Sequence, residues 1–355
     1  MIRKDRPLDD PNKIITTFRR NDFLQLTFQT DGCRYSASGS CSMCNYGKGK
    51  KINIQDILKE LETICQSKDF YDCSMVLLGA SGSFLDDYEI PEEYQFKIME
   101  RIAKSNMSEI FIETHYKSIT IEKLHKIRNL FGDKCIYIEM GLETITEEFQ
   151  FNILNKVIKL NELDKIIKQI HAENMLVSLN VLLGMPFLNK NEQIADTLKS
   201  IRWALDKKVD YVVVFPINIQ PYTLFEWWYA NDFLSVVSPW LLVELLLELT
   251  DDELKNVCLA WYGNRCIAYS DEKKTQIPYA CPLCQPYLVD FFEKFSGNFD
   301  LEYRKKILKN LCNTKFSCNC REDFNKQSES IESPREIAYE ALERLVNDYA
   351  INGSN

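Results

Sequence analysis

The sequence contains no long uncharged apolar run, no excess of positive charge and only three histidines. Its first ten residues, MIRKDRPLDD, are charged and lack the apolar core that a signal peptide needs. The most apolar window, residues 233–249, includes Pro239, Glu244 and Glu248, which favours a buried amphipathic helix over a membrane span. We therefore expect a cytoplasmic protein with no membrane partner.

What the composition does contain is acidic charge and many cysteines. The 355 residues have a formal net charge of -9, which argues against broad electrostatic binding of nucleic acid, although a local basic stripe can be hidden in such a total. Thirteen cysteines in a reducing compartment indicate metal ligation, catalysis or burial rather than a disulfide framework. A metal site is therefore the leading hypothesis for some of these thiols.

Short β-branched runs alternate with longer segments of helical period between residues 23 and 217. This alternation is typical of successive βα units around a parallel sheet. The six units found are too few for a closed eight-stranded barrel, so we expect an α/β fold with an open, partial (βα)6 barrel. The expected strands are 23–28, 74–79, 109–114, 135–140, 175–183 and 211–217.

The same pattern divides the chain into three parts. We expect an N-terminal extension over residues 1–22 and the barrel over residues 23–224. From residue 225 the pattern becomes helical and includes further cysteines. This change predicts a C-terminal helical extension with a metal-binding cysteine cluster over residues 225–355.

Three cysteines follow the first expected strand in the segment TDGCRYSASGSCSMCNYGKG, residues 30–49. Cys41 and Cys44 form a C-x-x-C pair, and Cys33 precedes them across a loop of small residues. A cubane 4Fe-4S cluster usually takes four thiolates, so three leave one iron open for a chelating ligand. Zinc or plain burial is the alternative for the pair alone, but no fourth cysteine or histidine is near in the sequence. The position after a strand favours the cluster, because active sites gather where parallel strands end.

Four motifs resemble those of a known family: GCRYSASGSCSMCNYG, GASGSFLDDYEIPEE, IYIEMGLETITEEF with the following Asn155-Lys156, and GMPF. On these motifs the sequence resembles the radical S-adenosylmethionine enzymes. The wide cysteine spacing is similar to that of the Elongator-catalytic-subunit branch, and the four motifs resemble the radical subunit of archaeosine synthase over residues 20–325. The chain departs from that family in reading IETHYKS, residues 112–118, where relatives usually read like E-S-R-P-E.

The resemblance implies a 4Fe-4S cluster on Cys33, Cys41 and Cys44 and a bound S-adenosylmethionine. Reductive cleavage of S-adenosylmethionine would give a 5'-deoxyadenosyl radical that abstracts hydrogen from the substrate, with an electron donor of the flavodoxin or ferredoxin type. In such enzymes an aromatic residue stands beside the cysteines, and a glycine-rich turn contacts the amino group of the cofactor. The corresponding residues here are Tyr46, Gly79, Ser81, Gly82 and Ser83.

Polar residues at the ends of later strands are further candidates. Glu113, Glu139 and Asn180 can hold ribose hydroxyls or the amino group of the cofactor, provided that their strands have the expected register. Around them the sequence predicts more ordinary roles. We expect His115 to be a surface-loop histidine, Asp86 and Asp87 to cap the next helix or contact substrate, and Trp227 and Trp228 to pack in the core.

A second group of cysteines lies in the C-terminal region, in CPLC and LCNTKFSCNC. A C-x-x-C followed after about thirty residues by a C-x-C resembles a zinc knuckle or an auxiliary cluster site. We favour zinc. The expected ligands are Cys281, Cys284, Cys318 and Cys320, with Cys312 as a further candidate.

The sequence therefore predicts a radical S-adenosylmethionine enzyme that acts on a small-molecule metabolite in a biosynthetic pathway. The acidic balance and the altered loop IETHYKS favour that substrate class. One alternative is a tRNA nucleoside-modifying lyase of the archaeosine-synthase type, and another is transfer of a 3-amino-3-carboxypropyl group from S-adenosylmethionine. An alternative of a different class is a non-catalytic zinc-binding interaction protein, in which both cysteine groups hold zinc.

Overall fold

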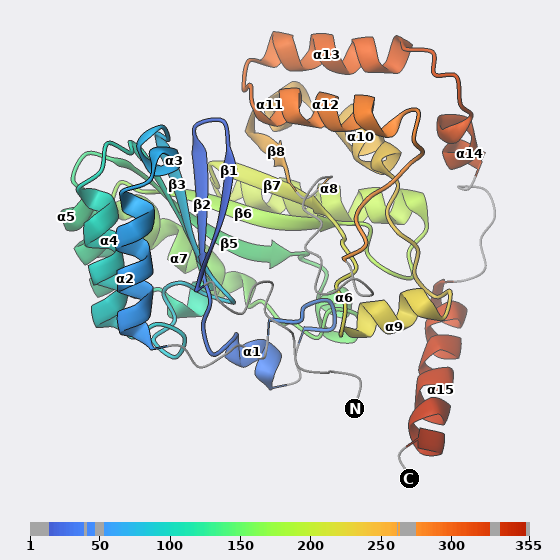
Figure 1. The fold of residues 1–355 in the computed structure, drawn as a ribbon. Coiled ribbons are helices and arrows are strands. Elements are labelled where there is room, and N and C mark those ends of the chain that lie inside the picture. Colours follow the sequence, from blue (N-terminus) through green and yellow to red (C-terminus); the bar gives the residue numbers. More distant parts are fainter. Residues whose placement is uncertain are drawn as a thin grey trace.

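An eight-stranded curved sheet forms the centre of the protein, and its strands lie side by side in the order of the chain (Figure 1). The structure is a computed structural model that describes residues 14–38, 41–46, 53–260, 262, 275–326 and 334–352. The first strand pairs antiparallel with the second, and every later pair of neighbours is parallel. The strands are β1 (Ile15–Arg20), β2 (Phe23–Phe28), β3 (Met75–Ala80), β4 (Glu109–Glu113), β5 (Cys135–Glu143), β6 (Leu176–Leu183), β7 (Tyr211–Pro216) and β8 (Val257–Leu259).

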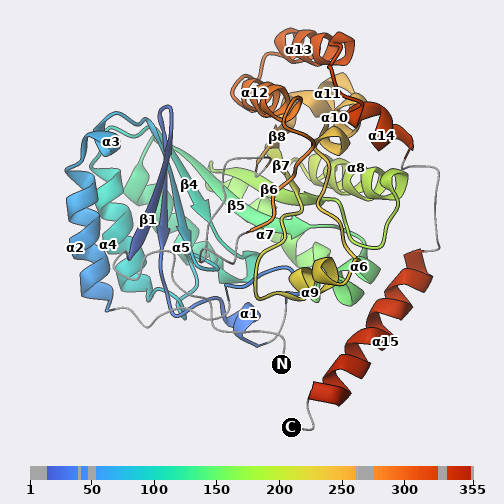
Figure 2. The same cartoon turned by 45° about the vertical axis from the view of Figure 1, so that its right-hand side comes forward.

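Helices follow most of the parallel strands and cover the outer side of the curved sheet (Figures 1 and 2). The long ones bury one apolar face against the strands, as α4 does with Ile98, Met99 and Ile102. The N-terminus of α8 is fixed by a capping box between Asn189 and Glu192. These helices are α2 (Ile54–Cys65), α4 (Glu92–Ala103), α5 (Ile121–Phe131), α7 (Leu160–Ala172) and α8 (Lys190–Asp206). Shorter ones are α1 (Arg34–Ala37), α3 (Lys68–Tyr71), η1 (Tyr116–Ser118), α6 (Glu147–Asn152) and α9 (Leu224–Ala230).

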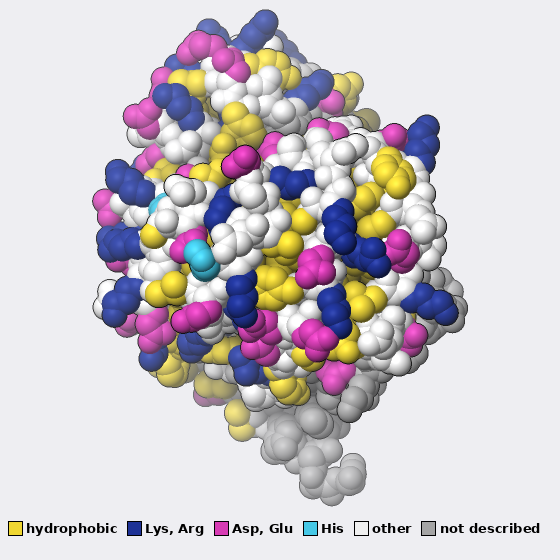
Figure 3. Space-filling view, turned by 90° about the vertical axis from the view of Figure 1, so that its left-hand side faces the viewer, with side chains coloured by type: hydrophobic (Ala, Val, Ile, Leu, Met, Phe, Trp, Pro, Cys, Tyr) yellow, Lys and Arg dark blue, Asp and Glu magenta, His cyan; other side chains and the backbone are white. Residues whose placement is uncertain are grey.

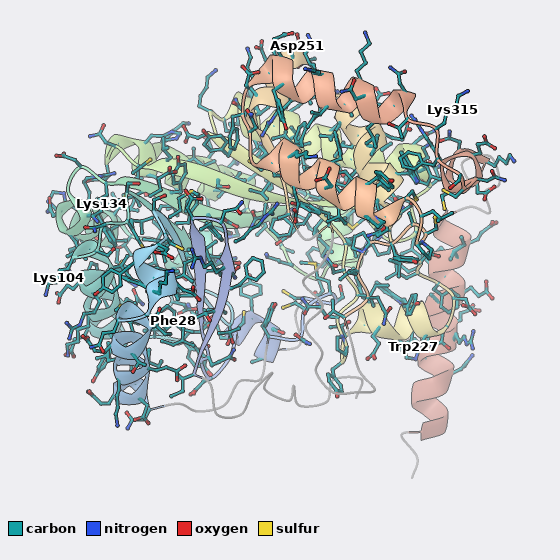
Figure 4. The ribbon with its side chains drawn as sticks, turned by 45° about the horizontal axis from the view of Figure 1, so that its top comes forward. Phe28, Lys104, Lys134, Trp227, Asp251 and Lys315 are labelled. Carbon is teal, nitrogen blue, oxygen red and sulfur yellow. The ribbon has the colours of Figure 1, made fainter. Side chains whose placement is uncertain are left out.

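Helices α10 to α13 stack next to the last strands, whereas α15 lies apart from these strands, on the side of α9 (Figures 1 and 2). Arg304 is fully buried among the stacked helices, and its guanidinium donates hydrogen bonds to the carbonyls of Leu254 and Val257 and of Phe295. Figure 4 labels Asp251, the first residue of α11, which pairs with Lys305 of α13 at 2.8 Å. The helices are α10 (Pro239–Leu247), α11 (Asp251–Asn256), α12 (Gln285–Ser296), α13 (Leu301–Asn313), α14 (Cys320–Lys326) and α15 (Pro334–Asn352). Within the described ranges, no helix has the length and apolar character that crossing a bilayer requires.

The expected partial barrel is confirmed, and the six expected strands appear as β2 to β7. Two further strands, β1 and β8, were not predicted. β8 has only three residues, which is too short to give a periodic signal. β1 lies in the segment expected to be an extension, and it pairs with β2 along its whole length. The most apolar window forms α10, whose residues are mostly buried, as expected.

Candidate active site

A cavity of about 650 Å³ opens at the C-terminal ends of the parallel strands. Residues from β1 and β2, the cysteine loop, and the segments after β3 to β7 line it together. Parallel strands end at the same edge of a sheet, so residues that are far apart in sequence meet there. Among the residues selected from the sequence, the cavity is lined by Cys33, Cys41, Cys44, Tyr46, Ser81, Gly82, Ser83, Glu113 and Asn180.

The loop with the three cysteines is folded back on itself at the cavity. Cys33 precedes the short helix α1, and its amide donates to the carbonyl of Tyr46 at 2.7 Å. Because Tyr46 is only two residues after Cys44, this bond holds the backbone at Cys33 close to the segment that contains Cys44. Burial raises the pKa of Cys44 and also that of Cys33. A buried thiolate is costly unless a positive charge compensates it, so these thiols are suited to a metal rather than to free anionic chemistry.

Two other segments hold the C-x-x-C turn from opposite sides by backbone hydrogen bonds. On one side, the amides of Cys41 and Ser42 donate to the carbonyls of Asn155 and Leu154, at 3.1 and 2.9 Å. On the other side, the amide of Leu224 donates to the carbonyl of Ser42 at 3.0 Å. The turn is therefore fixed by segments that follow β5 and β7 in the chain.

The three sulfurs of the cavity are not arranged as ligands of one tetrahedral ion. Thiolates on one tetrahedral zinc lie about 3.8 Å apart, given a Zn–S bond of about 2.3 Å. Across the described ranges, only the second cysteine group brings three or more ligand atoms within 4.8 Å of one another. Cys33, Cys41 and Cys44 line one cavity without such close approach.

The turn GASGS packs directly against the first cysteine. A Cβ on Gly82 would lie 2.9 Å from the sulfur of Cys33 and 2.5 Å from Glu89 Oε1, so only glycine fits there. The amide of Gly82 donates to Glu89 Oε2 at 2.9 Å. Ser83 is also fixed, because its hydroxyl lies 2.8 Å from Thr114 Oγ1. The turn is thereby held rigidly beside the cysteine loop.

Glu89 is a site residue that the sequence reasoning did not select, although it stands in the quoted motif GASGSFLDDYEIPEE. It is only 7% exposed, and burial raises the pKa of its carboxyl to about 7. Its Oε2 accepts from the hydroxyl of Thr30 at 2.8 Å, whereas its Oε1 is buried without a protein partner. A buried acceptor of this kind calls for a ligand or a water.

Lys156 places a positive charge beside the cysteines. Its ammonium lies 2.5 Å from Glu143 Oε1, and both side chains are largely buried and line the cavity. Burial by itself lowers the pKa of Lys156, but Glu143 and the thiols of Cys41 and Cys44 outweigh it, so the pKa is raised and the lysine stays charged. A Cβ on Gly141 would lie 2.9 Å from the ammonium, so glycine leaves the room for this pair.

Of the polar residues at the strand ends, Glu113 and Asn180 line the cavity. Glu113 and Glu139 are direct partners on β4 and β5, and the amide of Asn180 on β6 donates to Glu139 Oε1 at 3.0 Å. Asn180 Oδ1 is buried without a protein partner. Gly79 and Glu139 are not among the lining residues. Gly79 lies next to one of the lining residues, since a Cβ on Gly79 would come within 2.9 Å of Glu113 Oε2.

The expectation of a surface role for His115 is wrong. Its ring lies in the cavity wall between the rings of Tyr35 and Tyr116, with centroids 5.4 and 4.7 Å away. Nδ1 accepts the amide of Lys117 at 3.2 Å, which leaves the proton on Nε2, and Nε2 is buried without a partner. Burial, followed by the charges of Lys156 and Lys117, lowers the pKa of His115 to about 3. The ring is therefore neutral at physiological pH.

Two other expectations have mixed outcomes. Asp86 and Asp87 do not cap α4, which begins after Pro91. Instead, Asp86 pairs with Arg34 in the cysteine loop at 2.8 Å, and Asp87 pairs with Lys123 at 2.6 Å.

The expected core role of the tryptophans is confirmed. Trp228 of α9 is buried. Trp227 of the same helix, labelled in Figure 4, stacks on Phe233. Neither tryptophan lines the cavity.

The second cysteine group meets outside the cavity. The sulfurs of Cys281 and Cys284, just before α12, of Cys318, just before α14, and of Cys320, the first residue of α14, all lie within 4.8 Å of one another. Hydrogen bonds from the Cys284 backbone and from Cys320 lower the pKa of Cys281 to about 6, whereas burial raises that of Cys284 to about 11. Cys312 does not belong to the group, and its carbonyl accepts from Arg321. The geometry suits one tetrahedral metal ion.

Comparisons with known proteins add sequence relatives and solved structures. No protein-family model matches the chain. An uncharacterized protein of Methanocaldococcus jannaschii is 24% identical over 340 residues, which cover 91% of this chain and 88% of that protein. An archaeosine synthase subunit beta of Thermococcus kodakarensis is 30% identical over 239 residues, which cover 63% of this chain and 71% of that subunit. A solved queuine lyase of Clostridium spiroforme, bound to SAM and queuine, is 20% identical with a TM-score of 0.44, covering 62% of this chain and 91% of that chain.

Proposed function

Since the chain is a radical S-adenosylmethionine enzyme and belongs to the family of the archaeosine synthase beta subunits, we propose that it modifies a nucleoside of tRNA by a lyase-type cleavage of a C–N bond. From the sequence alone, this reaction is an alternative to a reaction on a small metabolite. The relative of Thermococcus kodakarensis, whose name refers to a tRNA nucleoside, now favours it. The observation that carries the proposal is the set of three cysteines in one cavity with a buried lysine.

Cys33, Cys41 and Cys44 are the proposed ligands of a 4Fe-4S cluster. When bound, the cluster and S-adenosylmethionine supply hydrogen abstraction by a 5'-deoxyadenosyl radical. The chain's own contribution is to place the thiols, since two flanking segments fix the C-x-x-C turn by backbone hydrogen bonds.

Several cavity residues have the charge and position to hold S-adenosylmethionine. Lys156 offers the ammonium for its carboxylate, and the carboxyls of buried Glu89 and half-buried Glu113 offer acceptors for its amino group. The free Oδ1 of Asn180 is available for a ribose hydroxyl. Together these residues form a site with one cation and several acceptors, which matches a zwitterionic ligand with a sugar.

The second cysteine group is the proposed zinc site. Its four sulfurs approach closely enough for one ion, and cysteine-only tetrahedral sites are typical of structural zinc. Because the site lies outside the cavity, its proposed role is to hold α12 and α14 together. An auxiliary cluster is less favoured, since its thiolates would stand further apart.

A small metabolite is the second candidate substrate. The acidic total charge favours it, and so does the face formed by α2, α4 and α5, where basic and acidic side chains are interspersed (Figure 3). If the substrate is tRNA instead, Arg34 and Lys117 at the cavity are the cations best placed to bind its phosphate backbone. Transfer of an aminocarboxypropyl group has no specific observation in its favour. The expected cytoplasmic location and the flavodoxin or ferredoxin donor stay predictions.

The test is anaerobic analysis of iron, sulfide and zinc, followed by incubation with S-adenosylmethionine and dithionite. We expect about four irons and one zinc per chain, and 5'-deoxyadenosine on chromatography. Addition of archaeal tRNA should increase 5'-deoxyadenosine and alter one nucleoside in a digest. A colourless zinc protein that resists iron reconstitution would overturn the assignment as a radical enzyme. Formation of 5'-deoxyadenosine that tRNA does not affect would overturn the proposal that tRNA is the substrate.

A further inference from the structure

A continuous path of contacts joins the second cysteine group to the cysteine loop of the cavity. We propose that a metal ion bound by Cys281, Cys284, Cys318 and Cys320 positions the cluster-binding loop, by fixing the chain segment that supports Asn45 next to Cys44. The inference rests on the proposed metal site and goes beyond its local stapling role. It gives this site a part in the chemistry of a cavity that it does not touch.

The first step of the path runs from the metal site to the segment before it. Cys281 directly follows residues 275–280, and Cys284 is fully buried at the start of α12. The side chain of Gln285 accepts the amide of Ala280 at 2.9 Å and donates to the carbonyl of Pro278 at 3.2 Å. The turn that carries two of the four thiols therefore also fixes residues 278–280.

The second step crosses to the cavity wall. Gln276 and Ile219 exchange two backbone hydrogen bonds of 2.9 Å as an isolated antiparallel bridge. Ile219 is buried, and its neighbours Asn218 and Gln220 both line the cavity. A two-residue bridge has little stability alone, so it depends on what holds its ends. One end continues from β7, and the other leads to the cysteines.

The third step reaches the cluster loop. The side-chain oxygen of Gln220 accepts the amide of Asn45 at 3.3 Å, and the amide of Asn45's own side chain donates to the carbonyl of Pro221 at 3.0 Å. Asn45 is buried and adjoins Cys44. The loop after Gln220 is continuous with the start of α9, whose first amide bonds to Ser42. One side of the C-x-x-C turn is thus built on the segment that the bridge supports.

The far side of the metal site is tied to the helical layer rather than to the cavity. The segment between α13 and α14, which begins near Lys315 in Figure 4, carries Cys318. Arg321 of α14 lies over the ring of Trp240 and donates to the carbonyl of Cys312. The metal therefore joins the stable helical layer to residues 276–284. Without it, that segment loses its link to Cys318 and Cys320, and the ring contact between Tyr287 of α12 and Phe316 remains.

Metal removal should loosen only one of the two anchors of the turn. The bonds from Cys41 and Ser42 to the segment after α6 are independent of the path. We therefore expect the cysteine loop to become more mobile without unfolding. Amide hydrogen exchange measures this directly, because it reports local opening of individual hydrogen bonds.

The experiment compares full-length protein before and after zinc removal with a chelator, by hydrogen exchange with mass spectrometry, in the absence of the iron cluster. We expect exchange in fragments covering residues 41–46, 218–222 and 275–280 to rise about tenfold, and to return when Zn²⁺ is added back. Fragments from α4 and α5 should stay within about twofold, which excludes general unfolding. Loss of zinc with unchanged exchange at residues 41–46 would overturn the inference.

A second variant separates the path from the metal. Gln276→Pro removes the backbone donor of the bridge, whereas Gln276→Ala keeps it. We expect Gln276→Pro to retain zinc and still show faster exchange at residues 41–46, and Gln276→Ala to behave like the native chain. Zinc-free native protein would overturn both the metal and the path, but iron binding and 5'-deoxyadenosine formation test the radical function separately.

Discussion

The two cysteine groups contain the same C-x-x-C spacing but form sites of different kinds. In the cavity, Cys41 and Cys44 are joined by Cys33 as the third cysteine, and backbone bonds from two segments hold the turn. In the C-terminal region, Cys281 and Cys284 meet a second pair closely enough for one ion. The comparison teaches that the motif alone does not specify the metal. Our different proposals for the two sites rest on the number of thiols and on the spacing imposed by the surrounding backbone.

Electrostatics separates the two groups as well. Burial raises the pKa of Cys44, and the nearest compensating charge is the buried ammonium of Lys156. Hydrogen bonds among the C-terminal cysteines lower the pKa of Cys281 to about 6 instead. The cavity group thus depends on its proposed cofactor and on one lysine for charge balance, whereas in the C-terminal group Cys281 favours the thiolate, although burial raises the pKa of Cys284. Four substitutions test this contrast.

The largest expected effect is that of Cys44→Ala. Because three thiolates are the proposed minimum for the cluster, iron and formation of 5'-deoxyadenosine should fall below about 1% of the native values, while zinc stays. Iron analysis and chromatography measure both. Cys135→Ala, at a thiol outside both groups, is the matched control and should retain its cluster. Full iron in Cys44→Ala would show that the site assignment is wrong.

The reverse result is expected from Cys284→Ala. Zinc should fall below about 0.2 per chain, and the thermal midpoint should drop by about 5 °C or more, because the metal links α12 to α14. Iron should still reach about four per chain on reconstitution. Metal analysis and calorimetry measure these quantities. If Cys284→Ala lost iron and kept zinc, the two groups would have to exchange their proposed roles.

A smaller effect is expected from Lys156→Met, which removes the cation beside the cavity cysteines. The dissociation constant for S-adenosylmethionine should rise about 10- to 100-fold, since a charge-assisted hydrogen bond contributes about 1.5–3 kcal/mol. Equilibrium dialysis with the reconstituted enzyme measures it. Lys159→Met, which removes an exposed lysine paired with Glu162, is the control. Equal affinities in both variants would argue against the role proposed for Lys156.

The smallest effect concerns the pH dependence of stability at His115. Its folded pKa of about 3 lies below the ordinary value of 6.5, so the unfolded chain binds a proton that the folded chain excludes. The contribution of His115 to the free energy of unfolding should therefore be fully present above pH 6.5 and decrease as the pH falls toward 3. His115→Gln should flatten this slope, and His125→Gln, at an exposed ring, should not. Urea unfolding at pH 7.5 and 5 compares the variants. Equal slopes in native protein and His115→Gln would contradict the buried neutral ring.

Much of the barrel could be predicted from the sequence because it depends on local periodicity. The β-branched runs that became β2 to β7 sit where the alternation placed them, and the register of Glu113, Glu139 and Asn180 followed from period two. β8 could not be predicted, since three residues are too few to show an alternating pattern. His115 was misjudged because a loop residue's burial depends on its neighbours. Tyr35 and Tyr116, which enclose it, come from different segments.

The sequence by itself determined the βα order, the three-thiol loop and the second cysteine group, because each depends on residue type and short spacing. Only the tertiary structure decided that Glu89 and Lys156 join the cysteines, and that the second group closes to within the reach of one ion. The same holds for the bridge between Ile219 and Gln276. These contacts form between residues that are far apart along the chain, and no local pattern encodes the folding that brings them together.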